Sequence, residues 1–282
     1  TKLKKIANYF LKEEDKEIKD FCMMGFLSIL EDVSLVRKHG SHYRFLNNDK
    51  SIGLQKLNIE TIDNNANIFK VFKLALRQIL DDIEVTEGGP LKSPKIICGD
   101  SKSTKLNSNS IDLVITSPPY LNRNNYIAQQ KSELDFLQMI NNKNEYKEIV
   151  KSTFRSHTDS ELPKDSRSSL SEINTIIKSI QLEEGNNMKI PHMISGYFDD
   201  INNLLIELFR LVKKGGQCAF VLGNTRWGGI VVPVDHLVVK IAEDIGFRCK
   251  KILVTRYKGN SPQQMKKYGR IPVRESIIIF SK

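Results

Sequence analysis

Residues 111–120 read Ile-Asp-Leu-Val-Ile-Thr-Ser-Pro-Pro-Tyr, a short apolar run that passes directly into two successive prolines. The run is rich in β-branched residues and is bounded by turn-forming residues, which is the pattern of a buried parallel strand. The two prolines remove two backbone donors, fix two φ angles and keep Ser117 and Pro118 out of the helical region. This stretch therefore predicts a strand that continues into a stiff, extended loop.

Apolar runs of the same kind occur on both sides of this strand. They predict further strands at residues 95–98, 218–223, 251–257 and 276–280. Two amphipathic segments predict helices between them: residues 197–212, closed by the Lys-Lys-Gly-Gly of 213–216, and residues 234–245, ended by Gly246. Alternating strands and helices predict an α/β fold with a doubly wound sheet.

The N-terminal part of the chain has a helical pattern instead. Residues 1–45 are expected to form helices, and residues 46–66, polar and Asn-rich, a loop. Residues 66–85 predict another amphipathic helix, which Gly88-Gly89-Pro90 breaks.

The change of pattern divides the chain into a helical N-terminal region, residues 1–90, and an α/β domain, residues 91–282. Residues 121–195 are mixed and polar, and we interpret them as an insertion within the second domain. The four cysteines lie far apart and form no Cys-x-x-Cys pair, which argues against a disulfide framework and against a metal site. With no signal-peptide pattern at the start, these features favour a cytoplasmic location.

The net charge of +10 is concentrated in the last quarter of the chain. Residues 205–282 hold fifteen Lys and Arg against five Asp and Glu, whereas residues 1–204 are neutral overall. A one-sided basic field suits a polyanion such as DNA, and a solvated lysine-rich surface explains the same count equally well. Eight residues are candidates for phosphate contacts: Lys250, Lys251, Arg256, Lys258, Lys266, Lys267, Arg270 and Arg274.

The loop Thr116-Ser117-Pro118-Pro119-Tyr120 has the groups needed to hold a flat ring that bears an amine. The ring would stack on Tyr120, while the Ser117 hydroxyl and the Pro118 carbonyl accept hydrogen bonds from the amine. The alternative is a loop that only ends a strand. In doubly wound sheets, ligands bind beyond the carboxyl ends of the strands. Asp100, Ser117 and Asn224 each follow such an end, which favours a functional role for the loop. Of the three, Asn224 is interpreted as a structural or supporting polar residue rather than a catalytic one.

Residues 99–126, GDSKSTKLNSNSIDLVITSPPYLNRNNY, resemble the amino-methyltransferases of bacterial and archaeal restriction–modification systems. Those enzymes methylate N4 of cytosine or N6 of adenine in DNA. The resemblance covers nearly everything from Lys95 to the end of the chain. It implies a Rossmann-like methyltransferase sheet with helices on both faces, S-adenosylmethionine as the methyl donor, double-stranded DNA as the substrate and no metal.

The resemblance also implies roles for individual residues. Ser117, Pro118, Pro119 and Tyr120 would form the catalytic loop, and Asp100, helped by Ser101, would contact the adenine of the cofactor. Hydrogen bonds to Ser117 and Pro118 would free the lone pair of the base amine, which then attacks the methyl group directly. The target base must leave the duplex, because its amine is paired there.

One part of the family pattern is absent from this sequence. The glycine-rich cofactor loop, of the type Asp-Pro-Phe-x-Gly-x-Gly, has no match in the chain. In the family, it belongs to the first two strands, which lie between the strands that correspond to residues 95–98 and 111–116. We therefore expect a partner polypeptide or an N-terminal segment to supply them, the chain being a fragment or one subunit of a split enzyme.

Two other classes of function remain open at this stage. One is a non-catalytic DNA-binding or specificity subunit, and the other is a methyltransferase for RNA bases or protein glutamine. Ser117 favours cytosine N4 over adenine N6. The insertion at 121–195 is the candidate for base recognition, and its residues Arg123, Arg155 and His157 are either DNA contacts or structural residues.

Overall fold

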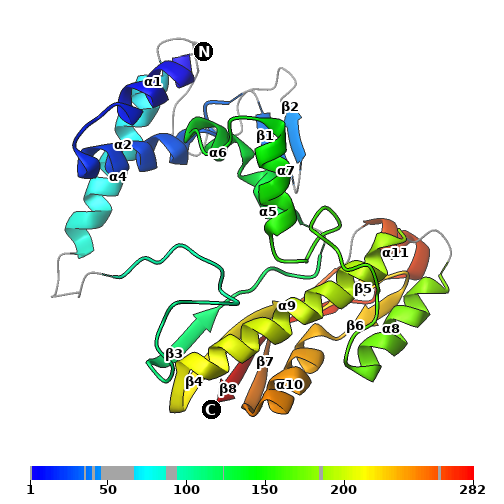
Figure 1. Ribbon diagram of the computed structural model, residues 1–282. Helices are drawn as coiled ribbons and strands as arrows, with labels where there is room; N and C mark the ends of the chain where they lie inside the picture. Colours follow the sequence, from blue (N-terminus) through cyan, green and yellow to red (C-terminus); the bar gives the residue numbers. More distant parts are fainter. Residues whose placement is uncertain are drawn as a thin grey trace. The chain divides into compact units, whose positions relative to one another are not determined.

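The computed structural model describes residues 2–34, 36–39, 42–45, 67–86, 94–122, 124–183, 187–259 and 262–282. The predicted loop 46–66, the Gly88-Gly89-Pro90 break and Arg123 lie outside the described residues. The chain forms two compact units (Figure 1). Unit 1 comprises Thr1–Lys95 and Tyr126–Ile149, and unit 2 comprises Ile96–Asn125 and Val150–Lys282. Residues 126–149 of the expected insertion therefore pack with the N-terminal region.

Unit 1 is mainly helical. Its helices are α1 (Lys2–Leu11), α2 (Lys16–Ile29), α4 (Asn67–Thr86), α5 (Tyr126–Gln129), α6 (Lys131–Phe136) and most of α7 (Lys143–Ser152). The carboxylate of Asp15 caps α2 by accepting the N–H groups of Glu17 and Ile18 at 2.9 and 3.1 Å. Phe26 and Val71 belong to the core between α2 and α4. The helix predicted at 66–85 is confirmed as α4.

The prediction that residues 1–45 are all helical is wrong at its C-terminal end. Strands β1 (Val36–His39) and β2 (His42–Phe45) form an antiparallel hairpin, in which His39 pairs with His42. Between these partners the sequence is Gly-Ser, a composition that two-residue hairpin loops favour. A helix was predicted here because the apolar residues before this turn are at helical spacing.

Unit 2 contains a four-stranded mixed sheet with the order β3-β4-β8-β7. The strands are β3 (Ile111–Thr116), β4 (Val212–Gly223), β7 (Arg248–Lys258) and β8 (Val273–Ser281). β3 is parallel to β4, whereas β8 is antiparallel to both of its neighbours. The helices are α8 (Ser171–Gln181), α9 (Lys189–Leu211), α10 (Val234–Ile245) and α11 (Pro262–Tyr268), and β5 (Thr225–Trp227) pairs with β6 (Ile230–Val232). The predicted α/β fold class is confirmed.

The core of unit 2 lies on one face of this sheet. Phe220 and Leu222 of β4 are fully buried with Leu205 of α9 and Val238 of α10. The two helices run along the same side of the sheet (Figure 1). The opposite face is apolar but much more accessible. Its side chains at Leu113, Ile115 and Leu253 are 56%, 73% and 43% exposed. Within the described part of unit 2, the helices therefore cover one face, although helices were expected on both.

Two expectations about local structure in unit 2 are wrong. Residues 95–98 form no strand, and Ile96 is 91% exposed. In the described residues β3 pairs only with β4, so this segment has no adjacent strand to complete its backbone hydrogen bonds. Residues 213–216, expected to close the preceding helix, belong to β4, where Gly215 has a φ of +81° and the register against β3 shifts.

No helix among the described residues is long and apolar enough to cross a membrane.

Candidate functional site

The Pro-Pro loop follows the end of β3, where Thr116 pairs with Phe220 of β4. Pro118 is buried, whereas Ser117 is exposed and donates a hydrogen bond from its hydroxyl to the carbonyl oxygen of Val221 at 3.3 Å. Because a hydroxyl has a single proton, this contact leaves the lone pairs of the Ser117 oxygen to accept hydrogen bonds. The loop therefore presents an acceptor to solvent from a fixed position on the sheet.

Tyr120 lies beside the end of β4. A Cβ added to Gly223 would lie 3.1 Å from Cδ2 of the Tyr120 ring, so the absence of a side chain at residue 223 makes room for the ring. On one face of the ring, the ammonium group of Lys258 is 4.9 Å from the ring centroid. Tyr120 is half-buried by this arrangement. The backbone of β4 and the side chain of Lys258 thus set the position of the ring.

Lys258 and Arg256 both contact Glu275, a residue of β8 that is 9% exposed. Arg256 donates to the Glu275 carboxylate from Nε at 3.0 Å and from Nη2 at 3.2 Å, and Lys258 Nζ lies 3.3 Å from Oε2. The Arg256 hydrogen bonds, followed by those of Lys258, hold the pKa of Glu275 below its usual range against the opposing effect of burial. The carboxylate is therefore charged at neutral pH and anchors both cations beside the loop.

Asp100 begins a turn in the segment that leads to β3. Its Oδ1 accepts the backbone N–H of Lys102 at 2.9 Å and lies 3.2 Å from the Lys102 ammonium group. The backbone hydrogen bond is the main reason why the pKa of Asp100 is lowered. The side chain is 54% exposed, and the neighbouring Ser101 is exposed as well. Asp100 is thus an ionised, accessible carboxylate that is held by the Lys102 of its own turn.

A buried carboxylate on α9 holds this segment, a feature that the sequence analysis missed. Glu207 Oε1 accepts hydrogen bonds from the backbone N–H and the hydroxyl of Thr104 at 2.8 and 2.6 Å. Arg210 donates to Glu207 and, at 2.9 Å, to the carbonyl of Leu106. Hydrogen bonding by Arg210, and then by Thr104, lowers the pKa of Glu207 to about 2. Only the packing of α9 against residues 104–106 reveals this role.

Asn224 has a structural role, as the sequence analysis favoured. Its Oδ1 accepts the backbone N–H of Asp235 at 3.1 Å, in the first turn of α10. Asp235 is fully buried and accepts hydrogen bonds from Arg274 Nε at 2.7 Å and from the Ser276 hydroxyl at 2.8 Å. Arg274, one of the candidate phosphate contacts, is therefore engaged in an ion pair inside the fold.

Two of the candidate recognition residues, His157 and Arg155, also make structural contacts within the fold. His157 is 2% exposed: its Nδ1 accepts the N–H of Asp159 at 3.3 Å, and its Nε2 lies 2.9 Å from the Thr153 hydroxyl. Burial lowers the pKa of His157, which favours the neutral ring. Arg155 donates to Asp200 from both its backbone N–H and its guanidinium group at 2.8 Å. These side chains stabilise the segment 153–159 against α9.

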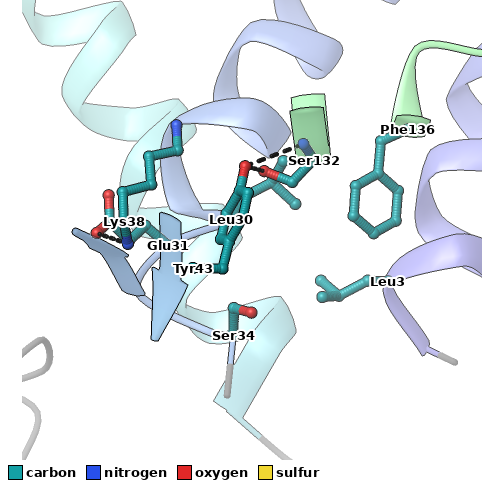
Figure 2. A pocket seen from close by; sticks show the side chains of 8 residues that line it. All are labelled: Leu3, Leu30, Glu31, Ser34, Lys38, Tyr43, Ser132 and Phe136. Atoms are coloured by element: carbon teal, nitrogen blue, oxygen red, sulfur yellow. Dashed lines mark hydrogen bonds between the residues drawn. The ribbon is translucent and has the colours of Figure 1, made fainter. Parts of the chain in front are cut away.

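Unit 1 has a pocket of its own, drawn in Figure 2. Its lining residues are Leu3, Leu30, Glu31, Ser34, Lys38, Tyr43, Ser132 and Phe136. The Tyr43 hydroxyl donates to the carbonyl of Gln129 and accepts the N–H of Ser132, both at 3.1 Å, while Lys38 forms an ion pair with Glu133. Because these polar groups already form hydrogen bonds or an ion pair within the protein, the pocket offers no evident group of side chains for binding a ligand.

No protein-family model matches the chain. In sequence, it is 33% identical over 305 residues to the Type II methyltransferase M.BsoBI of Geobacillus stearothermophilus, an alignment that covers 94% of this chain and 60% of that protein. It is 29% identical over 307 residues to the Type II methyltransferase M.AvaI of Anabaena variabilis, covering 97% of this chain and 61% of that protein. The chain thus spans about three fifths of the length of these relatives.

Among solved structures, the chain is similar to TTHA0409 of Thermus thermophilus. Two crystal structures of it give TM-scores of 0.31 and 0.33 at 16% and 15% identity, covering 65% of this chain and 50% and 52% of theirs. These values are too low to support a conclusion. The relatives in sequence, in contrast, agree with the resemblance carried by residues 99–126: nearly the whole chain is similar to about three fifths of each of these Type II methyltransferases.

Proposed function

We propose that this chain holds the target base in a DNA amino-methyltransferase. The reaction transfers a methyl group from S-adenosylmethionine to the exocyclic amine of a base flipped out of double-stranded DNA, with cytosine N4 favoured over adenine N6. The observation that carries the proposal is the hydrogen bond from Ser117 to Val221, which turns an exposed hydroxyl at the end of β3 into an acceptor. The sequence relatives, which are Type II methyltransferases, support the same reaction class.

The proposed roles of the loop follow from its chemistry. An exocyclic amine conjugated with its ring is a weak nucleophile, because its lone pair is delocalised. Hydrogen bonds from the two amine protons to Ser117 Oγ and to the Pro118 carbonyl draw the nitrogen toward tetrahedral geometry and localise that lone pair. Pro119 keeps the loop extended, and the Tyr120 ring stacks on the base. When bound, S-adenosylmethionine supplies the electrophilic methyl group.

Asp100 and Ser101 are the residues that we propose for the adenine of the cofactor. Both Lys102 contacts involve Oδ1 of Asp100, and the side chain is 54% exposed. An accessible, ionised carboxylate suits an amine donor such as the exocyclic group of adenine. The residues present therefore fit this half of a cofactor site. The glycine-rich turn of the family, which would support the methionine half, has no counterpart in the sequence.

We propose that a further segment, in the same polypeptide or in a partner, supplies that turn and pairs with β3. Among the described residues, β3 pairs with β4 on one side only, and its side chains at Leu113 and Ile115 are largely exposed. An unpaired strand edge beside an accessible apolar face is the surface that an added strand would complete. Such an added strand would also give residues 95–98 a neighbour.

The experiment is to express the chain in cells, alone and together with the sequence that lies upstream of it or in the adjacent reading frame. Plasmid DNA from each culture is digested to nucleosides, and N4-methylcytosine and N6-methyladenine are quantified by mass spectrometry. We expect N4-methylcytosine only when the added sequence is present. Unmethylated DNA in both cultures, together with methylated RNA or protein, would contradict the proposal.

A further inference from the structure

Arg256 of β7 is fixed by a largely buried carboxylate of β8. Its Nε and Nη2 groups donate to the two oxygens of Glu275 at 3.0 and 3.2 Å, so one edge of the guanidinium group is paired with the whole carboxylate. The Glu275 side chain is 12% exposed, whereas that of Arg256 is 66% exposed. The guanidinium group is therefore held in one place while most of the side chain stays accessible to solvent.

The hydrogen bonds to Glu275 use only part of the donor capacity of Arg256. A guanidinium group has five N–H donors, and in the part of the chain that the structure describes no residue accepts a hydrogen bond from Nη1. Nη1 and the second N–H of Nη2 form another pair of parallel donors at the end of the group. Such a pair matches two oxygens of a phosphate, which the point charge of a lysine does not. Arg256 thus has a second, accessible edge that suits a phosphate.

The register of the sheet places this ion pair beside the proposed base site. Glu275 pairs with Gly223 of β4 and with Arg256 of β7. Gly223 borders the Tyr120 ring, since a Cβ at this residue would lie 3.1 Å from Cδ2 of the ring. Hydrogen bonding by Glu275 is the main reason why the pKa of Arg256 is raised, and a smaller electrostatic effect of Tyr120 acts in the same direction. The guanidinium group therefore lies near the loop that would hold the base.

We propose that Arg256 binds, through its second edge, a backbone phosphate next to the flipped base, and that Glu275 is the positioning residue that fixes its guanidinium group. This inference rests on the proposed function and adds to it a defined contact with the DNA. A base that rotates out of the duplex stays attached to its sugar and phosphates. The phosphates on either side of that nucleotide therefore lie near the loop that holds the base.

A general attraction between basic residues and DNA makes the opposite prediction for Glu275. Glu275→Gln removes a negative charge beside two cations, so a surface that acts only through its net charge would bind DNA more tightly. If Glu275 fixes Arg256, the same change releases the guanidinium group and weakens binding despite the gain in positive charge. We expect binding that is weaker by about threefold, which is the cost of ordering one long side chain in the complex.

The test uses the chain together with the segment that restores methylation, and a duplex with the recognition sequence identified by methylation sequencing. Each phosphate near the target base is replaced in turn by an uncharged methylphosphonate, and fluorescence anisotropy measures the affinity. We expect one replacement to weaken binding by the wild type roughly tenfold, as loss of a hydrogen bond between charged groups does. Arg256→Met should bind the unmodified duplex equally weakly and should lose nothing more at that phosphate. Its slope of log affinity against log salt should be lower by about 0.9.

Arg248→Met is the matched control, because Arg248 is an exposed arginine at the opposite end of β7 and is not among the candidate phosphate contacts. It should respond to every methylphosphonate as the wild type does. If Arg256→Met does not fold, Arg256→Lys keeps the charge without the second pair of donors and should show a smaller response at the same phosphate. Tighter binding by Glu275→Gln, or a full response of Arg256→Met to every replacement, would overturn the inference. A wild type that methylates no DNA would instead refute the proposed function.

Discussion

Ser117 is the residue whose proposed role can be tested most directly. The side chain is exposed, so Ser117→Ala should leave the fold and DNA binding nearly intact. It removes one of two acceptors for the base amine, and we expect methyl transfer to fall by about two orders of magnitude, as for loss of one preorganised contact to a transition state. Incorporation of radiolabelled methyl groups into DNA measures this effect.

Ser28→Ala is a suitable control for that variant, because Ser28 is an exposed serine of α2 in unit 1 and belongs to none of the proposed sites. Its methyl transfer should equal that of the wild type. A Ser117→Ala protein with normal turnover would show that the hydroxyl is not an acceptor in the reaction.

Glu207 gives a second prediction at the scale of a single residue, through the dependence of stability on pH. Its pKa is about 2 in the fold, below the ordinary glutamate value near 4.3 that holds in the unfolded chain. The unfolded state therefore binds the proton more readily, and the stability that this group contributes is present above the unfolded pKa and is lost as the pH falls toward 2.

We accordingly expect Glu207→Gln to lower the free energy of unfolding at pH 7 and to reduce its decline between about pH 4.5 and the acid limit. Urea denaturation at several pH values, followed by circular dichroism, measures both effects. Glu243→Gln, at an exposed glutamate of α10, is the matched control and should change neither. Equal acid sensitivity of the wild type and Glu207→Gln would contradict the assigned role.

At the scale of the elements, the sequence predicted those helices and strands of unit 2 whose start and stop signals lie within a few residues of the element itself. The helix α10 ends at Gly246, whose φ of +117° suits a residue without Cβ, and the sequence placed this stop correctly. The strand β3 and its Pro-Pro loop were likewise predicted correctly from the sequence of residues 111–120 alone. The failure at 95–98 has another cause: an apolar run becomes a strand only when a neighbour supplies hydrogen bonds, and no local pattern reports that neighbour.

The candidate site was predictable to a similar extent. The loop 116–120 could be found because proline constrains its own backbone wherever it occurs. Lys258 and Glu275 were not predicted to act near the loop, because they come from strands far along the chain and only the register of β4, β8 and β7 places them there. Contacts of this kind depend on topology and leave no signature in the spacing of residues.

Two exposed lysines on α11 provide a test of the basic C-terminal quarter. Lys266 and Lys267 are exposed at the end of this helix, whereas Arg274 is held by buried Asp235. If both lysines contact phosphate, replacing them with alanine should reduce the slope of log affinity against log salt by about two. Arg274→Ala should act differently, by lowering stability, since it leaves a buried carboxylate without its cation.

Fluorescence anisotropy with a labelled duplex at several salt concentrations measures the slope. Lys5 and Lys12 are exposed residues of the N-terminal region, and replacing both should leave the slope unchanged. If the Lys266 and Lys267 double variant behaves in the same way, the charge on α11 is only a solvated surface.

At the scale of the whole molecule, we predict that this chain alone binds S-adenosylmethionine weakly. The residues proposed for the adenine and the base are present, but the glycine-rich turn between them is not in the sequence. Glycine is needed in such turns because a backbone without Cβ lets the ligand approach closely. Calorimetry of the chain should show no binding in the micromolar range, and adding the missing segment should restore it. Micromolar binding by the lone chain would place the cofactor elsewhere.

The unpaired side of β3 also affects how the protein behaves when it is produced in isolation. Among the described residues β3 pairs on one side only, and a strand of this kind with exposed Leu113 and Ile115 is a template for the same strand of another molecule. The isolated chain should therefore associate at rising concentration, and light scattering should detect particles larger than a monomer. A lysine introduced by Leu113→Lys should keep the chain dispersed, as charged residues do on natural sheet edges. The same change should also prevent methylation by the assembled enzyme. A variant of β3 that stays dispersed in isolation would therefore be inactive after assembly.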